Sequence, residues 1–77
     1  MQKIKLGKYQ HYKGDFYQVL NIARHSETGE DYVVYQGLYD DSELGPNPVF
    51  VRPLQMFTET VSWNGSTLPR FKFISTN

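Results

Sequence analysis

The segment from residue 31 to residue 39, Asp-Tyr-Val-Val-Tyr-Gln-Gly-Leu-Tyr, constrains the fold of this chain more than any other. It holds three of the six tyrosines and two adjacent valines, and no charged residue follows its first position. Aromatic and β-branched side chains pack well on a pleated surface, so we expect a β-strand here. In a strand, Val33, Tyr35 and Tyr39 share one face, while apolar groups also occupy the other face. The segment therefore predicts a strand that is covered on both sides or wrapped inside a small barrel.

The length and composition of the chain predict one small domain, residues 1–77, with a thin core. The chain has no cysteine, which excludes disulfides and thiolate metal sites and favours a reducing compartment. No stretch has the roughly 20 apolar residues that a membrane helix needs, so we expect a soluble cytoplasmic protein. Aromatic residues make up 16% of the chain and must supply much of the buried area. We expect six of them in the core, namely Tyr17, Tyr35, Phe50, Phe57, Trp63 and Phe71.

The formal net charge is zero, but the charges are distributed unevenly along the chain. Residues 1–25 carry a balance of +4, residues 26–43 a balance of −6, and the remainder a balance of +2. These segments either form one basic and one acidic face or cancel one another where they lie side by side. A nonspecific nucleic-acid binder usually has a clear basic excess, and this chain has none.

Turn signals divide the chain into short strands. Gly14-Asp15, Thr28-Gly29 and Asn64-Gly65 predict tight turns, and the acidic segment at residues 40–48 predicts an exposed, mobile loop. Pro53–Phe57 has the spacing of one helical turn, with a strand after it. We count five strands and a candidate sixth, an edge strand or loose arm at residues 1–6. The pattern predicts an all-β, small antiparallel SH3-like barrel or half-open roll of five to six strands with one short helical turn.

The expected strand at residues 16–24 changes its apolar phase. Tyr17 and Val19 set one register, whereas Leu20 and Ile22 set the other. A shift of one residue moves every side chain to the opposite face, so we expect a β-bulge near Val19 to Asn21. Asparagine tolerates a positive φ better than most residues, which makes Asn21 the expected pivot.

Several short motifs resemble a bacterial family of small uncharacterised proteins. They are the HYKG sequence at residues 11–14, RHSET at 24–28, VRPLxMF at 51–57 and PRF at 69–71. Together they are similar to the domain-of-unknown-function family numbered sixteen-fifty-three, over roughly residues 7–73. One departure is Asn21, where the family pattern has glycine. The resemblance implies a compact, mainly β domain of SH3-like type, and it implies no activity.

Catalytic signals are weak in this sequence. His11 and His25 are the only histidines, and neither has a neighbouring histidine or cysteine, so we expect no metal site and no cofactor. The neighbours Arg24 to Glu27 include the residue types of a triad, but consecutive strand residues point to opposite faces. There is no phosphate-binding loop and no nucleophile elbow. An enzyme is therefore the less favoured interpretation.

Recognition through aromatic and arginine side chains is the favoured interpretation, because these residue types dominate binding surfaces. The candidate contact residues are Tyr9, His11, Tyr12, Arg24, His25, Arg52 and Arg70. We expect a noncatalytic binding module for a peptide, protein or nucleic acid segment, with His11, Arg24 and an aromatic residue in one groove. Two alternatives stay open. One is an enzyme or accessory protein that acts on nucleotides or nucleic acid through His11 or His25, and the other is an oligomerisation domain that pairs through a strand edge, as a weak homo-oligomer.

Overall fold

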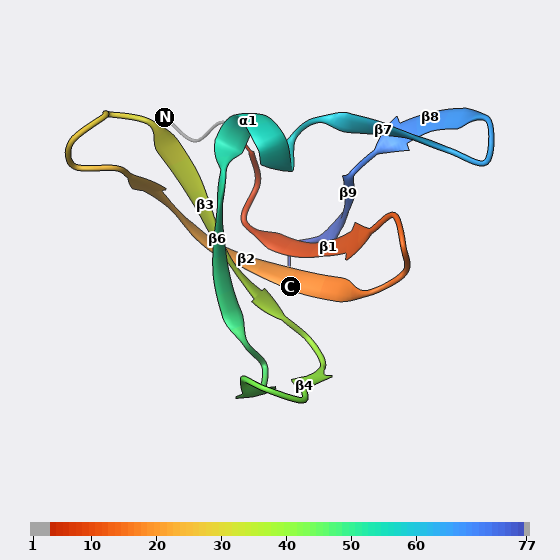
Figure 1. Ribbon diagram of the computed structural model, residues 1–77, viewed down its shortest axis with the longest axis horizontal. Coiled ribbons are helices and arrows are strands. Elements are labelled where there is room, and N and C mark those ends of the chain that lie inside the picture. Colours follow the sequence, from red (N-terminus) through yellow and green to blue (C-terminus); the bar gives the residue numbers. More distant parts are fainter. Residues whose placement is uncertain (1–3, 77) are drawn as a thin grey trace.

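The computed structural model describes residues 4–76 of the chain. Its elements run in the order β1 Gly7–His11, β2 Phe16–Arg24, β3 Asp31–Gly37, β4 Asp40–Asp41, β5 Gly45–Pro46, β6 Val49–Pro53, α1 Leu54–Phe57, β7 Thr60–Trp63, β8 Ser66–Pro69 and β9 Phe71–Ser75 (Figure 1). Within the described residues, no helix has the length and apolar character that crossing a membrane requires.

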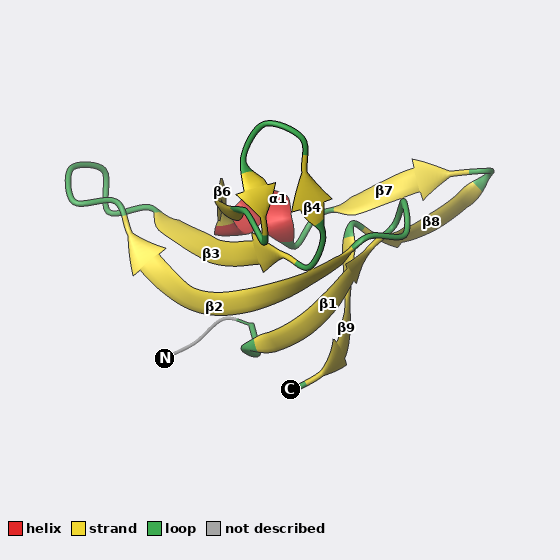
Figure 2. Ribbon diagram, turned by 90° about the horizontal axis from the view of Figure 1, so that it is seen from below, coloured by secondary structure: helices red, strands yellow, loops and turns green. Residues whose placement is uncertain are grey.

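A five-stranded antiparallel sheet in the order β6-β3-β2-β1-β9 forms the body of the protein. The edge strands β6 and β9 do not pair with each other, so the sheet curves without closing into a barrel (Figure 2). Two separate hairpins, β4-β5 and β7-β8, project from this sheet. The predicted mainly β fold with one short helical turn is confirmed, and of the two predicted forms the half-open one is observed.

The central strand β3 lies between β2 and β6, as its two apolar faces predict. Val33, Tyr35 and Gly37 point to the buried face, whereas the alternate residues are only half-buried. The strand ends at Gly37, two residues earlier than we expected. The chain then bends at Leu38 and Tyr39 into β4, which corrects the expected strand end.

The predicted bulge in β2 is confirmed by a register shift between Val19 and Asn21 in the pairing with β3. The conformation of Asn21 differs from our expectation, because the non-glycine residues with positive φ in the described chain are Asn47 and Asn64. Asn21 instead accepts a hydrogen bond on its side-chain Oδ1 from the backbone N–H of Ile22, at 2.8 Å. A local side-chain contact thus accompanies the irregularity without left-handed backbone.

The expected turns are present, and the acidic segment at residues 40–48 is more ordered than predicted. Asn64 and Gly65 both have positive φ, at 52° and 78°, and join β7 to β8 as a two-residue hairpin. The acidic segment is not an irregular loop, since it contains the β4-β5 hairpin. There the Oδ1 of Asp41 accepts hydrogen bonds from the backbone N–H groups of Glu43 and Leu44, at 2.8 and 2.9 Å.

The core is aromatic and lies on the concave face of the sheet, beneath α1. Its buried residues are Tyr9, Val19, Val33, Tyr35, Phe57 and Phe71. Phe57, from α1, stacks on Phe71 with ring centroids 4.1 Å apart and an interplanar angle of 4°. Tyr17 and Phe50 pack against this cluster and are half-buried. Tyr35, Phe57 and Phe71 are therefore core residues, as predicted.

Two aromatic residues do not lie where we expected. Trp63 is 43% exposed, because its hairpin pairs only with itself and stands away from the sheet. Tyr9, a candidate contact residue, is a core residue with 6% exposure, and its hydroxyl donates a hydrogen bond to the carbonyl of Lys5 at 2.7 Å.

The candidate strand at residues 1–6 lies partly outside the described residues, and Ile4 to Leu6 are not in a strand.

The close approach of Tyr39 to Gly37 leads to a testable prediction. A Cβ at position 37 would lie 2.6 Å from Cε2 of Tyr39, which is too close for carbon atoms. We expect Gly37→Ala to fold but to push the Tyr39 ring away from Tyr17, whose hydroxyl lies 3.3 Å from that of Tyr39. Nuclear Overhauser contacts between the two rings should disappear in Gly37→Ala and persist in the control Tyr39→Phe. Unchanged ring contacts in Gly37→Ala would show that Tyr39 packs less closely against residue 37 than described.

Candidate functional site

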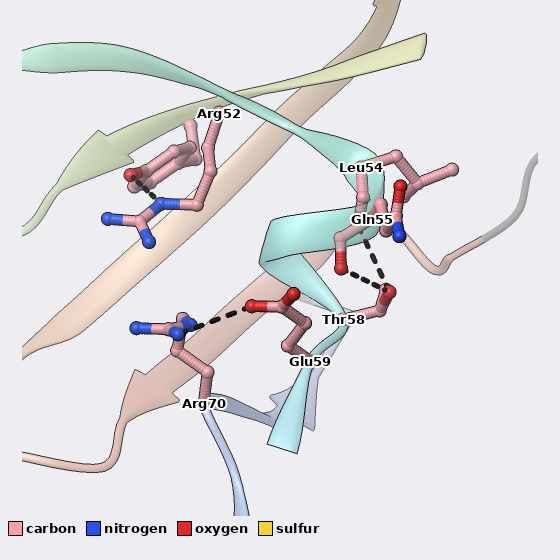
Figure 3. A network of polar contacts seen from close by, with 7 residues as sticks. Arg52, Leu54, Gln55, Thr58, Glu59 and Arg70 are labelled. Atoms are coloured by element: carbon pink, nitrogen blue, oxygen red, sulfur yellow. Dashed lines mark hydrogen bonds and ion pairs between the residues drawn. The ribbon is translucent and has the colours of Figure 1, made fainter. Parts of the chain in front are cut away.

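Two arginines and a histidine gather on the concave side of the sheet, where Arg52 and His11 lie against the ring of Phe71. We call Arg52, Arg70 and His11 the anion site. Arg52 comes from β6, Arg70 directly precedes β9, and His11 ends β1, so three separated segments build it. Figure 3 shows the guanidinium groups of Arg52 and Arg70 on the same side of α1.

Arg52 is held in place by aromatic neighbours and not by an acid. Its Nε donates a hydrogen bond to the Tyr35 hydroxyl at 3.2 Å, and its guanidinium carbon lies 5.7 Å from the centroid of the Phe71 ring. Within the described chain, Arg52 forms no ion pair with a carboxylate. A partly buried guanidinium that is fixed by a ring and a hydroxyl keeps its terminal N–H groups available for a ligand.

Arg70 has only a weak acidic partner. Its Nη2 lies 3.4 Å from Oε1 of Glu59, and the two side chains are 23% and 47% exposed (Figure 3). An exposed pair of this length stabilises a protein by about 0–1 kcal/mol. The Nε of Arg70 is buried and has no hydrogen-bond partner among the described residues. Arg70 is therefore positioned by its backbone, whose N–H donates to the Glu59 carbonyl at 3.0 Å, and its side chain keeps unused donors.

The end of α1 places Glu59. The hydroxyl of Thr58 donates to the carbonyl oxygens of Leu54 and Gln55, at 3.0 and 3.3 Å, and so closes the helical turn (Figure 3). The next residue, Glu59, then reaches Arg70 from the helix side. Thr58 is the C-cap residue of the helical turn, so Glu59 lies outside the helix.

His11 completes the anion site as a neutral ring. Burial lowers its pKa below the ordinary value of 6.5, and the positive charges of Arg52 and Arg70 lower it further, with Asp15 opposing them. Its Nδ1 accepts a hydrogen bond from the backbone N–H of Lys13 at 3.2 Å, so the proton of the neutral ring is on Nε2. His11 thus offers one more N–H donor beside two guanidinium groups.

Tyr35 contacts Arg52, Tyr17 contacts His11, and Tyr39 packs behind them against Tyr17. The ring of Tyr17 contacts those of Tyr35, Tyr39 and Phe71 edge-on, at 5.5, 5.6 and 5.5 Å. Burial, and then the hydrogen bond with Tyr39, raises the pKa of Tyr17, so its hydroxyl stays neutral in the physiological range. The site therefore combines two guanidinium groups and a neutral ring N–H donor with the uncharged hydroxyl of Tyr17. Glu59 forms an ion pair with Arg70, and Asp15 is a second acid that acts on His11.

The lowered pKa of His11 gives a prediction that tests the geometry of the site. Arg52→Gln should raise the pKa of His11 toward 6.5, because it removes a positive charge that disfavours the protonated ring. In the wild-type protein, the contribution of His11 to the free energy of unfolding should be fully present above pH 6.5. It should decrease as the pH falls from 6.5 through the lowered pKa of the folded protein, since the unfolded chain binds the imidazole proton more readily. Imidazole NMR titrations measure the pKa directly. Arg24→Gln is the control, and an equal shift in both variants would contradict the described cluster.

The other candidate residues lie elsewhere. Arg24 and His25 line an apolar hollow of about 260 Å³, together with Ala23, Tyr32 and Val51, at the opposite end of β2. Arg24 forms an ion pair with Asp31 at 3.3 Å. The Nδ1 of His25 accepts hydrogen bonds from the backbone N–H groups of Glu27 and Thr28, so it caps the loop between β2 and β3.

The structure thus brings three of the seven candidates together in the anion site, with Tyr12 beside them. The rings of His11 and Tyr12 lie 4.5 Å apart. His11 and Arg24 line different hollows, so the structure does not place them in one groove as we expected. Neither hollow has a carboxylate in its lining, and the described residues contain no group of three potential metal ligands of the His, Cys, Asp and Glu types.

Sequence reasoning missed the contributions of Tyr17 and Tyr39. Tyr17 was assigned to the core alone, and Tyr39 to the end of a strand. The available signal was the alternation in β1 and β2, which puts Tyr17 opposite Tyr9 and therefore on the same face as His11. The approach of Glu59 to Arg70 depends on the pairing of β7 with β8.

The acidic segment of the chain lies away from the anion site. Its charges are divided between the loop at residues 26–30 and the β4-β5 hairpin, and both project from other sides of the sheet than the turn at residues 12–15 (Figures 1 and 2). Charge pairing between the segments also occurs, since Arg24 of the basic segment forms an ion pair with Asp31 of the acidic segment, so the structure contains both arrangements left open by the sequence.

Comparison with known proteins agrees with the sequence motifs. The sequence profile described as "Protein of unknown function (DUF1653)" matches residues 7–73. The fold is similar to the crystal structure of a DUF1653 protein from Bordetella bronchiseptica, with a TM-score of 0.85 and 42% sequence identity. This similarity covers 96% of the present chain and 91% of the other. No protein with a curated description matches the chain.

Proposed function

This chain belongs to the DUF1653 family, whose function is unknown, and from that premise we propose that it is a noncatalytic binding module that recognises an anionic group through Arg52, Arg70 and His11. The group is a carboxylate or a phosphate carried by a peptide, protein or nucleic acid segment. Guanidinium groups bind both kinds of anion through paired hydrogen bonds.

One observation carries the proposal, namely that the guanidinium groups of Arg52 and Arg70 lie on the same side of α1 and form only one ion pair with the acids of the described chain, the 3.4 Å contact of Arg70 with Glu59. Two positive charges on the same side of the helix repel each other, and partial burial adds to the cost. A structural role would be served by a closely paired acid, which Arg52 does not have among the described residues. Such a locally unfavourable arrangement is typical of a functional site.

The neighbouring groups support binding and not chemistry. His11 is neutral and contributes an N–H donor, and the nearby hydroxyl of Tyr17 is uncharged. Glu59 serves as an internal substitute for the ligand, since its pair with Arg70 is long and exposed. A ligand with two oxygens in a plane would replace it and also engage Arg52.

Titration of the wild-type protein with sodium sulfate at low ionic strength tests this proposal. Nitrogen-15 spectra resolve the Nε–H groups of arginine side chains, so Arg24 serves as a control within the same molecule. We expect saturable shifts at Arg52 and Arg70, together with the His11 ring signals, and no comparable shift at Arg24. Equal, non-saturating shifts at all three arginines would reduce the effect to general screening and refute the proposal.

A further inference from the structure

We infer that the anion is a backbone phosphate of single-stranded nucleic acid and that an adjacent base stacks on the half-buried ring of Tyr12 and the exposed ring of Trp63. This inference rests on the proposed anion site and extends it by naming the ligand and a second contact surface. We call the rings of Tyr12 and Trp63 the stacking surface.

The stacking surface is continuous with the anion site. The ring of His11 lies 5.0 Å from that of Phe71 and 4.5 Å from that of Tyr12, and Tyr12 lies 5.3 Å from Trp63 in an edge contact. The backbone N–H of Tyr12 also donates to the carbonyl of Arg70 at 3.0 Å. A row of rings therefore leads from the two guanidinium groups to the β7-β8 hairpin.

Trp63 is exposed at a place where the fold does not need it. It is the only tryptophan in the chain, it lies on a hairpin that extends from the sheet, and its side chain is outside the core (Figure 2). A protein with so few buried residues would gain stability by burying this large ring. Its exposure beside Tyr12 is instead typical of the aromatic platforms on which bases stack.

A groove between β1, β8 and β9 shares His11 with the anion site and Tyr12 with the stacking surface. Its volume is about 230 Å³, and it is lined by Gln10, His11, Tyr12, Leu68, Pro69 and Lys72. The lining contains a lysine and no acid, and Lys13 lies at its edge with its Nζ 5.8 Å from the Tyr12 ring. The local charge is therefore basic, although the net charge of the whole chain is zero.

The alternation of cations and flat rings favours nucleic acid over an acidic peptide. A single strand presents a phosphate and a planar base in each repeat, so it can use the anion site and the stacking surface together. An acidic peptide would use the cations and leave the rings uncovered, because its side chains have no planar apolar group. Binding confined to one basic patch should weaken steeply with added salt.

The experiment compares four probes by the fluorescence of Trp63 in the wild-type protein: a short oligothymidylate, inorganic polyphosphate of matched charge, an oligoglutamate peptide and thymidine monophosphate. We expect the oligothymidylate to bind most tightly and to quench the fluorescence. Anisotropy of a labelled oligothymidylate should show roughly tenfold weaker binding to Tyr12→Ala. Tyr32→Ala, at the other hollow, is the matched control and should bind as the wild type does, and spectra of both variants verify their folds.

The outcomes separate this inference from the proposed function. If polyphosphate binds as tightly as the oligothymidylate and Tyr12→Ala changes nothing, the stacking inference is overturned while the anion site stands. Preference for oligoglutamate, or monophosphate binding equal to that of the strand, would also overturn it and would identify a different ligand. Absence of binding by all four probes, together with absent sulfate shifts at Arg52 and Arg70, would refute both the stacking inference and the proposed anion site.

Discussion

Replacement of Phe57 by alanine is expected to destabilise the protein by about 3–5 kcal/mol, close to the whole stability of a domain of this size. Phe57 is 2% exposed and stacks on Phe71, and its ring also contacts Tyr9 and Tyr35 edge-on at 5.4 Å. It is the only buried residue of α1, so no neighbouring helix side chain can fill the cavity. We expect the melting temperature to fall by roughly 15–30 °C, as measured by circular dichroism.

Met56→Ala is the control for this experiment. Met56 belongs to the same helix but is 44% exposed, so its truncation should change the stability by no more than about 0.5 kcal/mol. A loss of less than about 1 kcal/mol in Phe57→Ala would contradict the described core. It would mean that α1 is not the element that covers the concave face.

The second large effect is expected on ligand affinity. Arg52→Gln and Arg70→Gln should each weaken the binding of sulfate or of an anionic ligand by about 10- to 100-fold, because each removes charge-assisted hydrogen bonds. Glutamine keeps much of the side-chain length and an amide N–H, so the core around Phe71 should remain intact. Titration calorimetry at fixed ionic strength measures the affinity, and a nitrogen-15 spectrum verifies the fold.

Arg24→Gln is the matched control, since it also removes one positive charge but lies beside Asp31 at the other end of β2. It should leave the affinity nearly unchanged. Arg52→Lys separates charge from geometry, because lysine keeps the charge and loses the forked donors. If Arg24→Gln weakened binding as much as Arg52→Gln, net charge alone would explain the affinity, and the anion site would have no specific role.

Local features of this fold were predictable from the sequence. The bulge in β2 follows from the change of apolar phase between Val19 and Leu20, and the β7-β8 hairpin follows from Asn64-Gly65. Each depends on a few neighbouring residues, whose steric preferences do not need the rest of the fold. The same holds for the helical turn after Pro53.

The anion site was predictable only in its residue types. Arg52 and Arg70 are far apart in the sequence, and they meet because β9 pairs with β1 while β6 pairs with β3 across the curved sheet. Strand order of this kind depends on long-range pairing, which a single sequence does not reveal. Tyr9 shows the same limit, since it shares its strand face with His11 but lies beneath α1 instead of at the open end.

The pKa of His11, measured by NMR with and without saturating sulfate, tests the central claim most directly. Sulfate does not titrate in this range, and an anion held between Arg52, Arg70 and His11 would favour the protonated ring. Binding and protonation are linked reciprocally, so we predict that the pKa of His11, which is low in the free protein, rises when sulfate binds. An unchanged pKa at saturation would place the anion elsewhere and contradict the account of this site.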